Sequence, residues 1–139
     1  MGFRNIETVN WGIIGVGDVT EIKSGPAFYK VKHSNLVAVM RRNAKKAADY
    51  ADRHNVPKWY SDATDLINDP AVNAIYVATP PDSHAVYAIE AMRAGKPVYV
   101  EKPMARNYVE CREMLEVSRQ TGIPLWVAYY RRTLPAFLE

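Results

Sequence analysis

Apolar residues in this chain gather in short continuous runs, separated by longer and more polar stretches. The runs with strand character cover residues 8–14, 35–40, 74–79, 97–101 and 124–130. They do not alternate apolar and polar positions, which is typical of parallel strands covered on both faces of a sheet. The pattern therefore predicts buried parallel strands rather than a half-exposed antiparallel sheet.

The stretches between these runs have helical character. Helices are expected at residues 18–30 with a break at Gly25-Pro26, at 43–54, at 62–68, at 82–94 and at 107–121. The second of them should bury a narrow face that consists of Ala44, Ala47, Ala48 and Ala51. The last should open on a capping box of Asn107 and Glu110, end at Gly122, and bury Cys111, Met114, Leu115 and Ser118.

Strands that alternate with helices of this length predict right-handed crossovers and a doubly wound α/β sheet. The chain has 139 residues, enough for one domain with a substantial core and too few for two. No apolar run approaches the roughly 20 residues of a membrane span, and the N-terminus lacks an apolar signal segment. The single cysteine, Cys111, can form neither an internal disulfide nor a zinc cluster, so we expect a cytoplasmic protein without a metal site.

Basic residues are concentrated in one part of the chain. The net charge is only +3, but residues 30–58 hold eight basic and two acidic side chains. This favours an anionic partner at one place, although a solvated helix face also explains Lys45 and Lys46. A nucleic-acid partner is not expected, because the basic zone lacks interleaved aromatics and any binding motif.

A glycine-rich turn follows the first strand and opens the first helix. The turn consists of Gly15, Val16, Gly17, Asp18 and Val19. Gly15 would permit the tight turn, and Gly17 would let a pyrophosphate approach the backbone at the start of the helix. The third glycine of the dinucleotide-binding pattern is replaced by Thr20, so a sharp turn that binds nothing remains the alternative.

The end of the second strand distinguishes between the two nicotinamide cofactors. NAD-binding domains carry an acidic residue there, which hydrogen-bonds the adenosine ribose. This chain has Arg41 and Arg42, and a guanidinium can make forked bonds to the 2′-phosphate of NADP. The residues therefore favour NADP over NAD, with two exposed strand-end arginines as the alternative.

Two more polar clusters follow strands, where the ligand crevice of a doubly wound sheet lies. The first contains Thr79, Pro80 and His84, and the second contains Glu101 and Lys102. Lys102 is expected to lie partly buried at the crevice, where it could assist proton transfer from a substrate hydroxyl. A solvated Glu101–Lys102 ion pair and a His84 satisfied by the backbone are the alternatives.

The segments GIIGVGDV, LVAVMRRN, AIYVATPPDSHA, AGKPVYVEKPMA and VAYYRR, in this order, resemble the N-terminal domain of the Gfo/Idh/MocA oxidoreductases. The resemblance implies a Rossmann domain that binds NAD(P), with Glu101-Lys102-Pro103 at the active site. It implies that Lys102 is catalytic, that the Lys102–Pro103 bond is cis, and that Pro80 and His84 line the cofactor. Tyr130 stands where many members have an asparagine near the substrate, which makes a substrate role for it doubtful.

Family members also have a C-terminal α+β substrate domain, for which this chain has no counterpart. We therefore expect residues 1–139 to be the cofactor domain of a longer, homo-oligomeric enzyme, and Leu138-Glu139 could be a cloning scar. The expected reaction is NADP-dependent hydride transfer at a CH–OH group of a sugar or polyol, with little turnover by the isolated chain. A regulatory or redox-sensing nucleotide-binding module is the main alternative. A methyltransferase-like domain is less favoured, because it would need an acidic residue near Arg41.

Overall fold

A single parallel sheet organises the computed structural model, which describes residues 5–135. The strands are β1 (Val9–Ile14), β2 (Ser34–Met40), β3 (Lys58–Tyr60), β4 (Ala74–Val77), β5 (Val98–Val100) and β6 (Leu125–Val127). Their order in the sheet is β3-β2-β1-β4-β5-β6, and every neighbouring pair is parallel. The doubly wound parallel sheet that the sequence predicts is confirmed.

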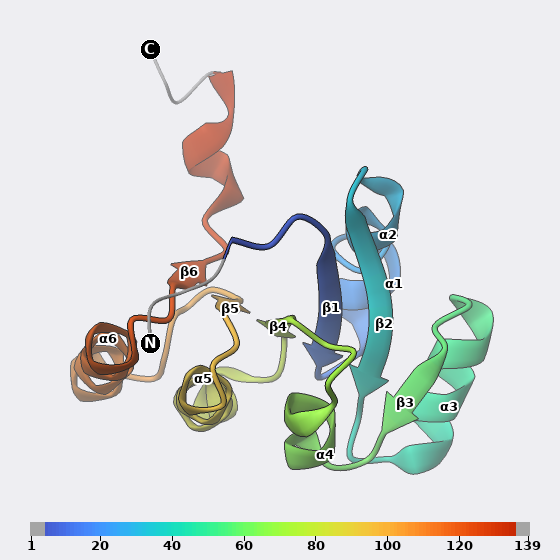
Figure 1. The fold of residues 1–139 in the computed structure, drawn as a ribbon, viewed down its shortest axis with the longest axis horizontal. Coiled ribbons are helices and arrows are strands. Elements are labelled where there is room, and N and C mark those ends of the chain that lie inside the picture. Colours follow the sequence, from blue (N-terminus) through green and yellow to red (C-terminus); the bar gives the residue numbers. More distant parts are fainter. Residues whose placement is uncertain (1–4, 136–139) are drawn as a thin grey trace.

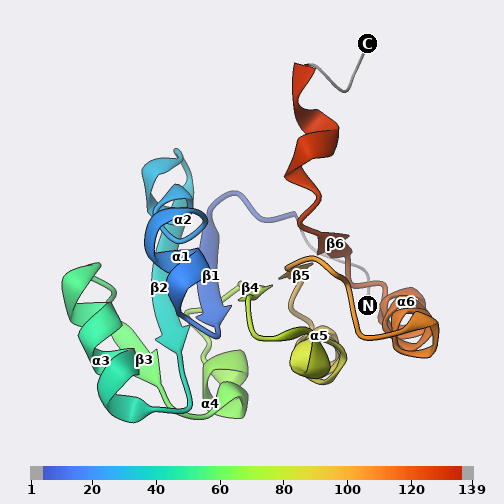
Figure 2. The ribbon, with the colours of Figure 1, turned by 180° about the vertical axis from the view of Figure 1, so that it is seen from behind.

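Helices cover both faces of the sheet (Figures 1 and 2). They are α1 (Asp18–Ile22), α2 (Ala27–Lys30), α3 (Ala44–Arg53), α4 (Ala63–Asn68), α5 (His84–Arg93) and α6 (Tyr108–Thr121). The first three lie on one face and the last three on the other, as right-handed crossovers in opposite directions from β1 require. None of the described helices is long and apolar enough to cross a membrane.

Two hydrophobic cores form, one on each side of the sheet. Ile14, Ile75 and Val77 face the core under α4, α5 and α6. Their strand neighbours Ile13 and Tyr76 face the opposite core, under α1 to α3. Adjacent residues of one strand therefore serve different cores, which explains why the strand sequences lack polar alternation.

The short edge strand β3 is absent from the expectations drawn from the sequence. It has only three residues, and Lys58 and Trp59 are exposed while Tyr60 is half-buried. Its backbone pairs with Ala38, Val39 and Met40 of β2. A short, exposed edge strand has no apolar run, so only the pairing with β2 reveals it.

The buried faces of two helices differ from those predicted. In α3, Ala44 is exposed, and the large Tyr50 joins Ala47 and Ala51 in the core. In α6, Leu115 is 57% exposed, whereas Val117 is buried beside Met114. Each helix is therefore rotated slightly about its own axis relative to the orientation that its apolar residues predict.

The structure also places the ends of several helices and strands differently from the ranges predicted from the sequence. Residues 81–83 form a short 3₁₀ turn, η1 (Pro81–Ser83), so α5 begins only at His84 and has no side-chain cap. Asn107 does cap α6, but Glu110 binds Arg106 instead of completing the capping box. β6 ends at Val127, and Tyr130 lies in a second 3₁₀ turn, η2 (Tyr130–Thr133). Leu138 and Glu139 lie outside the described residues.

Candidate functional site

The carboxyl ends of the four central strands meet at one edge of the sheet. The amides of Gly15 and Val16, just after β1, both donate to the carbonyl of Met40 at the end of β2, at 2.9 and 3.1 Å. The Ala78 amide donates to Ile14, and the Glu101 amide donates to Val77, each at 2.9 Å. The strand order reverses between β1 and β4, which is where doubly wound sheets bind their ligands.

Gly15 allows the loops after β1 and β4 to touch. Its φ is +94°, a conformation that side chains with a Cβ rarely adopt. A Cβ on Gly15 would lie 2.5 Å from Cγ2 and 2.8 Å from the backbone nitrogen of Thr79. Gly15 is therefore required by the fold of the site itself, and its role is close packing against the β4 loop.

Gly17 leaves open space at the same turn. A Cβ placed there would have one neighbour within 4 Å, Nη1 of Arg41, at 4.0 Å. Of the other turn residues, Val16 is buried and anchors the turn, while Asp18 and Val19 are exposed. An anionic group could approach the Gly17 backbone next to a guanidinium, so the residues present fit the diphosphate of a dinucleotide.

Thr20 explains how the turn holds together without a third glycine. Its side chain is fully buried, and its hydroxyl accepts the Gly17 amide at 2.9 Å and donates to the Gly17 carbonyl at 2.8 Å. The Thr20 carbonyl in turn accepts the hydroxyl of Tyr50 from α3, at 2.8 Å. A threonine at this position replaces close helix packing with local hydrogen bonds, which keep the turn in shape.

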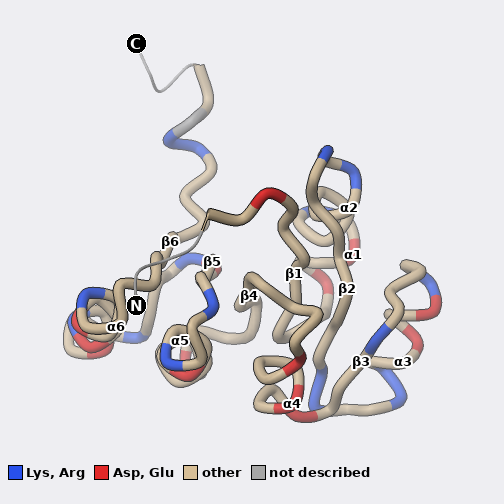
Figure 3. Tube along the Cα trace, viewed as in Figure 1, with Lys and Arg blue, Asp and Glu red and all other residues tan. Residues whose placement is uncertain are grey.

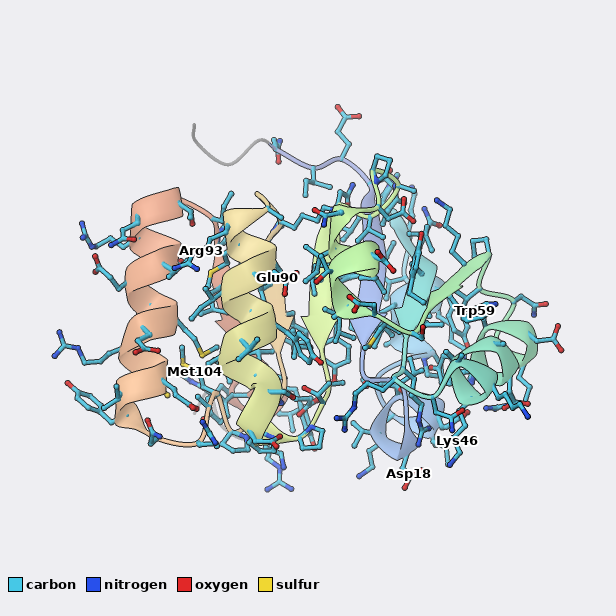
Figure 4. All side chains as sticks on the ribbon, turned by 90° about the horizontal axis from the view of Figure 1, so that it is seen from below. Asp18, Lys46, Trp59, Glu90, Arg93 and Met104 are labelled. Carbon is cyan, nitrogen blue, oxygen red and sulfur yellow. The ribbon has the colours of Figure 1, made fainter. Side chains whose placement is uncertain are left out.

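Arg41 lies between the glycine turn and β3. Its amide donates to the carbonyl of Tyr60 at 3.1 Å, its side chain is half-buried, and its guanidinium faces Gly17. Arg42 is exposed. Figure 3 shows basic segments at the end of β2 and the start of α3, and Figure 4 shows the side chains of Asp18 and Lys46 projecting outward.

His84 joins the two remaining strand-end loops from inside the protein. Its ring is fully buried, with Nε2 2.6 Å from the Thr79 carbonyl and Nδ1 2.9 Å from the Pro103 carbonyl. Within the described residues the ring contacts two backbone carbonyls, which matches the alternative of a backbone-satisfied histidine, and a contact of His84 with a cofactor stays a prediction. Thr79 is half-buried and packs against Gly15, and Pro80 is exposed.

Lys102 is exposed rather than partly buried, and it does not pair with Glu101. The Glu101 carboxylate instead accepts the Tyr76 hydroxyl at 2.6 Å and the Lys102 backbone amide at 3.1 Å. Among the residues that the structure describes, the Lys102 ammonium has neither a hydrogen bond nor an ion pair. The Lys102–Pro103 bond is cis, as expected.

Sequence reasoning missed Tyr76 and Ser24 at this site. The Tyr76 hydroxyl lies 3.1 Å from the hydroxyl of Ser24, which follows α1. Burial and the bond to the Glu101 carboxylate raise the pKa of Tyr76 far above its ordinary value, so it remains a neutral donor. The sequence does contain one indication of this contact: Tyr76 lies within a strand predicted to be buried on both faces. A buried tyrosine hydroxyl needs a hydrogen-bond partner.

A charged cluster braces α1 against α3 behind the glycine turn. Arg53 binds Glu21 and Asp49, and Nε2 of His54 lies 2.8 Å from Glu21. The hydrogen bonds from Arg53, more than those from His54, lower the pKa of Glu21 to about 2. No three acidic, histidine or cysteine side chains within residues 5–135 are arranged to hold a metal ion.

Comparison with known proteins agrees with this geometry. The sequence profile of the oxidoreductase family with an NAD-binding Rossmann fold matches residues 9–129. An oxidoreductase from Formosa agariphila is 51% identical over 131 residues, which cover 94% of this chain and 41% of the relative. The trans-1,2-dihydrobenzene-1,2-diol dehydrogenase of Macaca fuscata fuscata is 35% identical over 92% of this chain and 39% of its own length.

Solved structures show the same arrangement. A 3-ketoreductase from Actinomadura kijaniata, in complex with NADP and TDP-benzene, superimposes with a TM-score of 0.87 at 25% identity, covering 93% of this chain and 40% of that protein. The chain thus spans about two fifths of the length of these relatives. From the profile match, the sheet order and the strand-end site together, we conclude that the chain belongs to the Gfo/Idh/MocA oxidoreductases and forms their NAD-binding Rossmann domain.

Proposed function

We propose that residues 1–139 are the cofactor-binding domain of an NADP-dependent oxidoreductase that transfers hydride at a CH–OH group of a sugar or polyol. The observation that carries the NADP assignment is the position of Arg41. Its guanidinium faces the open side of Gly17, at the carboxyl end of β2. Neither Arg41 nor Arg42 has an acidic partner among the described residues.

An unpaired guanidinium at this point favours a phosphorylated ribose for a direct electrostatic reason. A 2′-phosphate adds negative charge and acceptor oxygens, with which a planar guanidinium forms charge-assisted bonds. A carboxylate at the same position would bind the hydroxyl of NAD and repel the phosphate of NADP. Arg42, exposed beside it, adds positive charge in the same place.

The other residues of the site have separate roles in this proposal. The turn from Gly15 to Val19 holds the diphosphate, Thr79 and Pro80 border the dinucleotide, and Glu101 and Lys102 lie where the reaction takes place. A bound nicotinamide supplies the hydride chemistry. The exposed ammonium of Lys102 hydrogen-bonds the substrate hydroxyl and assists its proton transfer.

The substrate class rests on the relatives, of whose length this chain covers about two fifths. One relative is named as a diol dehydrogenase and one structural neighbour as a 3-ketoreductase, so one name refers to hydroxyl groups and the other to a ketone. We propose that a second domain supplies the sugar or polyol site and that the whole enzyme is a cytoplasmic homo-oligomer. The experiments below separate this enzyme from a regulatory nucleotide-binding module.

Titration of the chain with NADPH and NADH tests the cofactor assignment. We expect tighter binding of NADPH, and Arg41→Asp should weaken NADPH binding by about 10- to 100-fold, since one charge-assisted bond contributes roughly 1.5–3 kcal/mol. The control is Arg93→Asp, which makes the same charge change at an exposed position of α5 (Figure 4). Tighter binding of NADH by the unmodified chain, or equal losses in both variants, would contradict the assignment.

A substitution at Lys102 separates an enzyme from a regulatory module. In the two-domain protein, Lys102→Ala should lower kcat by about 10²–10⁴, the usual contribution of a positioned acid–base group. NADPH affinity should change little in the same variant. Unchanged turnover in that variant would favour the regulatory module.

A further inference from the structure

A buried phenol in the middle of the sheet reaches the carboxylate beside Lys102. Tyr76 lies in β4 and is fully buried, in the core shared with α1 to α3. Its ring packs against Phe28 and Tyr99, with centroid distances of 4.9 and 5.5 Å. Its hydroxyl donates to Oε1 of Glu101 at 2.6 Å, so a rigid ring places a neutral donor at a fixed point below the site.

The second oxygen of that carboxylate holds the backbone of Lys102. Oε2 of Glu101 accepts the Lys102 amide at 3.1 Å. On the other side of the same segment, the Pro103 carbonyl lies 2.9 Å from Nδ1 of the buried His84. The backbone that carries Lys102 is thus held from both sides, by a chain from Tyr76 and by a ring from α5.

The choice of a tyrosine as donor has a chemical consequence. Within residues 5–135, no basic side chain pairs with the Glu101 carboxylate, although Lys102 is its sequence neighbour. A phenol satisfies the carboxylate without engaging the Lys102 ammonium, which therefore remains available. A tyrosine is protonated at neutral pH, and burial raises the pKa of Tyr76 further, so the hydroxyl stays a donor in alkaline solution too.

The same hydroxyl also connects to the segment that follows the glycine turn. Ser24 lies 3.1 Å from it and belongs to the connection between α1 and α2. One buried oxygen therefore contacts segments that come from β5 and from α1. Such a network is rigid only when each member is satisfied, and within residues 5–135 every buried side-chain polar atom has a hydrogen-bond partner.

We propose that Tyr76 is a positioning residue for Lys102: its hydroxyl holds the Glu101 carboxylate, and the carboxylate holds the Lys102 backbone. This inference rests on the proposed role of Lys102. Because Tyr76 is fully buried, it is proposed to act only through its bond to Glu101.

The test compares two hydroxyl deletions on the same face of the sheet, with amide exchange measured in the 139-residue chain and turnover in the two-domain protein. Tyr76→Phe removes the donor to Glu101, whereas Tyr99→Phe removes a hydroxyl without a hydrogen bond among the described residues. Amide hydrogen exchange of Lys102, followed by NMR, should be about tenfold faster in Tyr76→Phe. In the two-domain protein, kcat should fall by roughly three- to tenfold in that variant while NADPH affinity changes little, as in Lys102→Ala. Tyr99→Phe should change neither quantity.

A double-mutant cycle with Glu101 distinguishes positioning from a general structural effect. If Tyr76 acts through the carboxylate, Tyr76→Phe should have no further effect on either quantity in a Glu101→Ala background. Additive losses, or unchanged Lys102 exchange in Tyr76→Phe, would overturn the proposal. If Tyr76→Phe fails to fold, Glu101→Ala alone decides, because slow Lys102 exchange in that variant also overturns it.

The amide-exchange measurement and the functional measurement test separate claims, so each can fail without the other. The exchange measurement needs no cofactor, so it tests the contact even if the unmodified chain binds no NADPH, a result that would contradict the proposed function. Faster exchange with unchanged kcat in Tyr76→Phe would show that the contact exists and does not position Lys102, which overturns the inference alone.

Discussion

Two glycines in one turn serve different purposes, although they are only two residues apart. Gly15 has a positive φ and a backbone neighbour within 3 Å of its missing Cβ, whereas Gly17 has an extended backbone and open space. A side chain at Gly15 would collide with Thr79, while one at Gly17 would only occupy the space beside Arg41. The packing of the β4 loop therefore requires a glycine at position 15, whereas at position 17 only the proposed diphosphate contact would require one.

Alanine substitutions should separate these roles. We expect Gly15→Ala to lower the free energy of unfolding by about 2–4 kcal/mol, from left-handed strain and displacement of the β4 loop. Gly17→Ala should leave stability within about 1 kcal/mol and weaken NADPH binding instead. Urea denaturation and NADPH titration of both variants check this, and equal stability losses would contradict it.

Thr20 shows how a departure from a motif can be locally compensated. The position usually takes a third glycine, for close packing of the helix on the sheet. Here the hydroxyl bonds both the amide and the carbonyl of Gly17, and the close approach occurs instead at Gly25. A Cβ on Gly25 would lie 2.0 Å from the Thr20 carbonyl and 2.4 Å from the Tyr50 hydroxyl.

Replacing Thr20 by valine should show how much the hydrogen bonds between Thr20 and Gly17 contribute to stability. Thr20→Val keeps the side-chain shape but leaves the Gly17 amide without its acceptor. The Gly17 amide is only part-buried, so the loss of its acceptor should lower the free energy of unfolding by about 1 kcal/mol, the low end of the cost of an unsatisfied amide. Urea denaturation measures it, with the exposed Thr64→Val substitution in α4 as control.

At the scale of elements, the short helix α1 depends on its neighbour α3. Five residues are too few for a stable helix on their own, and α1 has no side-chain cap. Glu21 binds Arg53 and His54 of the neighbouring segment, and Tyr50 binds the Thr20 carbonyl. The helix behind the glycine turn is thus held in place by contacts that lie far apart in the sequence.

This bracing should make stability depend on pH in acid. The pKa of Glu21 is lowered from 4.5 to about 2, so the unfolded chain binds its proton first as pH falls. The stabilisation is therefore present above pH 4.5 and is lost as pH falls toward 2. Glu21→Gln should lower the free energy of unfolding at pH 7 by about 1 kcal/mol and reduce the acid dependence between these values. Unfolding curves at several pH values check this, and identical pH slopes in the two proteins would contradict it.

For the molecule as a whole, the site lies at the edge of a complete sheet, but the chain spans about two fifths of the length of its relatives. The glycine turn, Arg41 and Lys102 follow strands at one edge of that sheet. The proposed division between a cofactor part and a substrate part would account for the greater length of the relatives. If the proposed division is right, the isolated chain should bind the cofactor without catalysing the reaction.

We expect the 139-residue chain to bind NADPH and to show little or no dehydrogenase activity. At 100 times the dissociation constant, NADPH should stabilise the fold by about 2.7 kcal/mol, seen as a rise in Tm. Thermal unfolding with NADPH, with adenosine as a weak control ligand, measures this. Turnover at the rate of an ordinary enzyme would refute the proposed division.

The sequence by itself determined the doubly wound sheet, the interruption at Gly25 and the identity of the strand-end residues. These follow from local properties: apolar runs, helical spacing and backbone preferences. Tertiary structure alone decided the edge strand β3, the exposure of Ala44 and Leu115, and the partners of His84 and Glu101. Each of these depends on which surfaces meet across the fold. The clearest case is Lys102, because the sequence places Glu101 beside it while the fold gives the carboxylate to Tyr76, 25 residues away, and leaves the ammonium exposed.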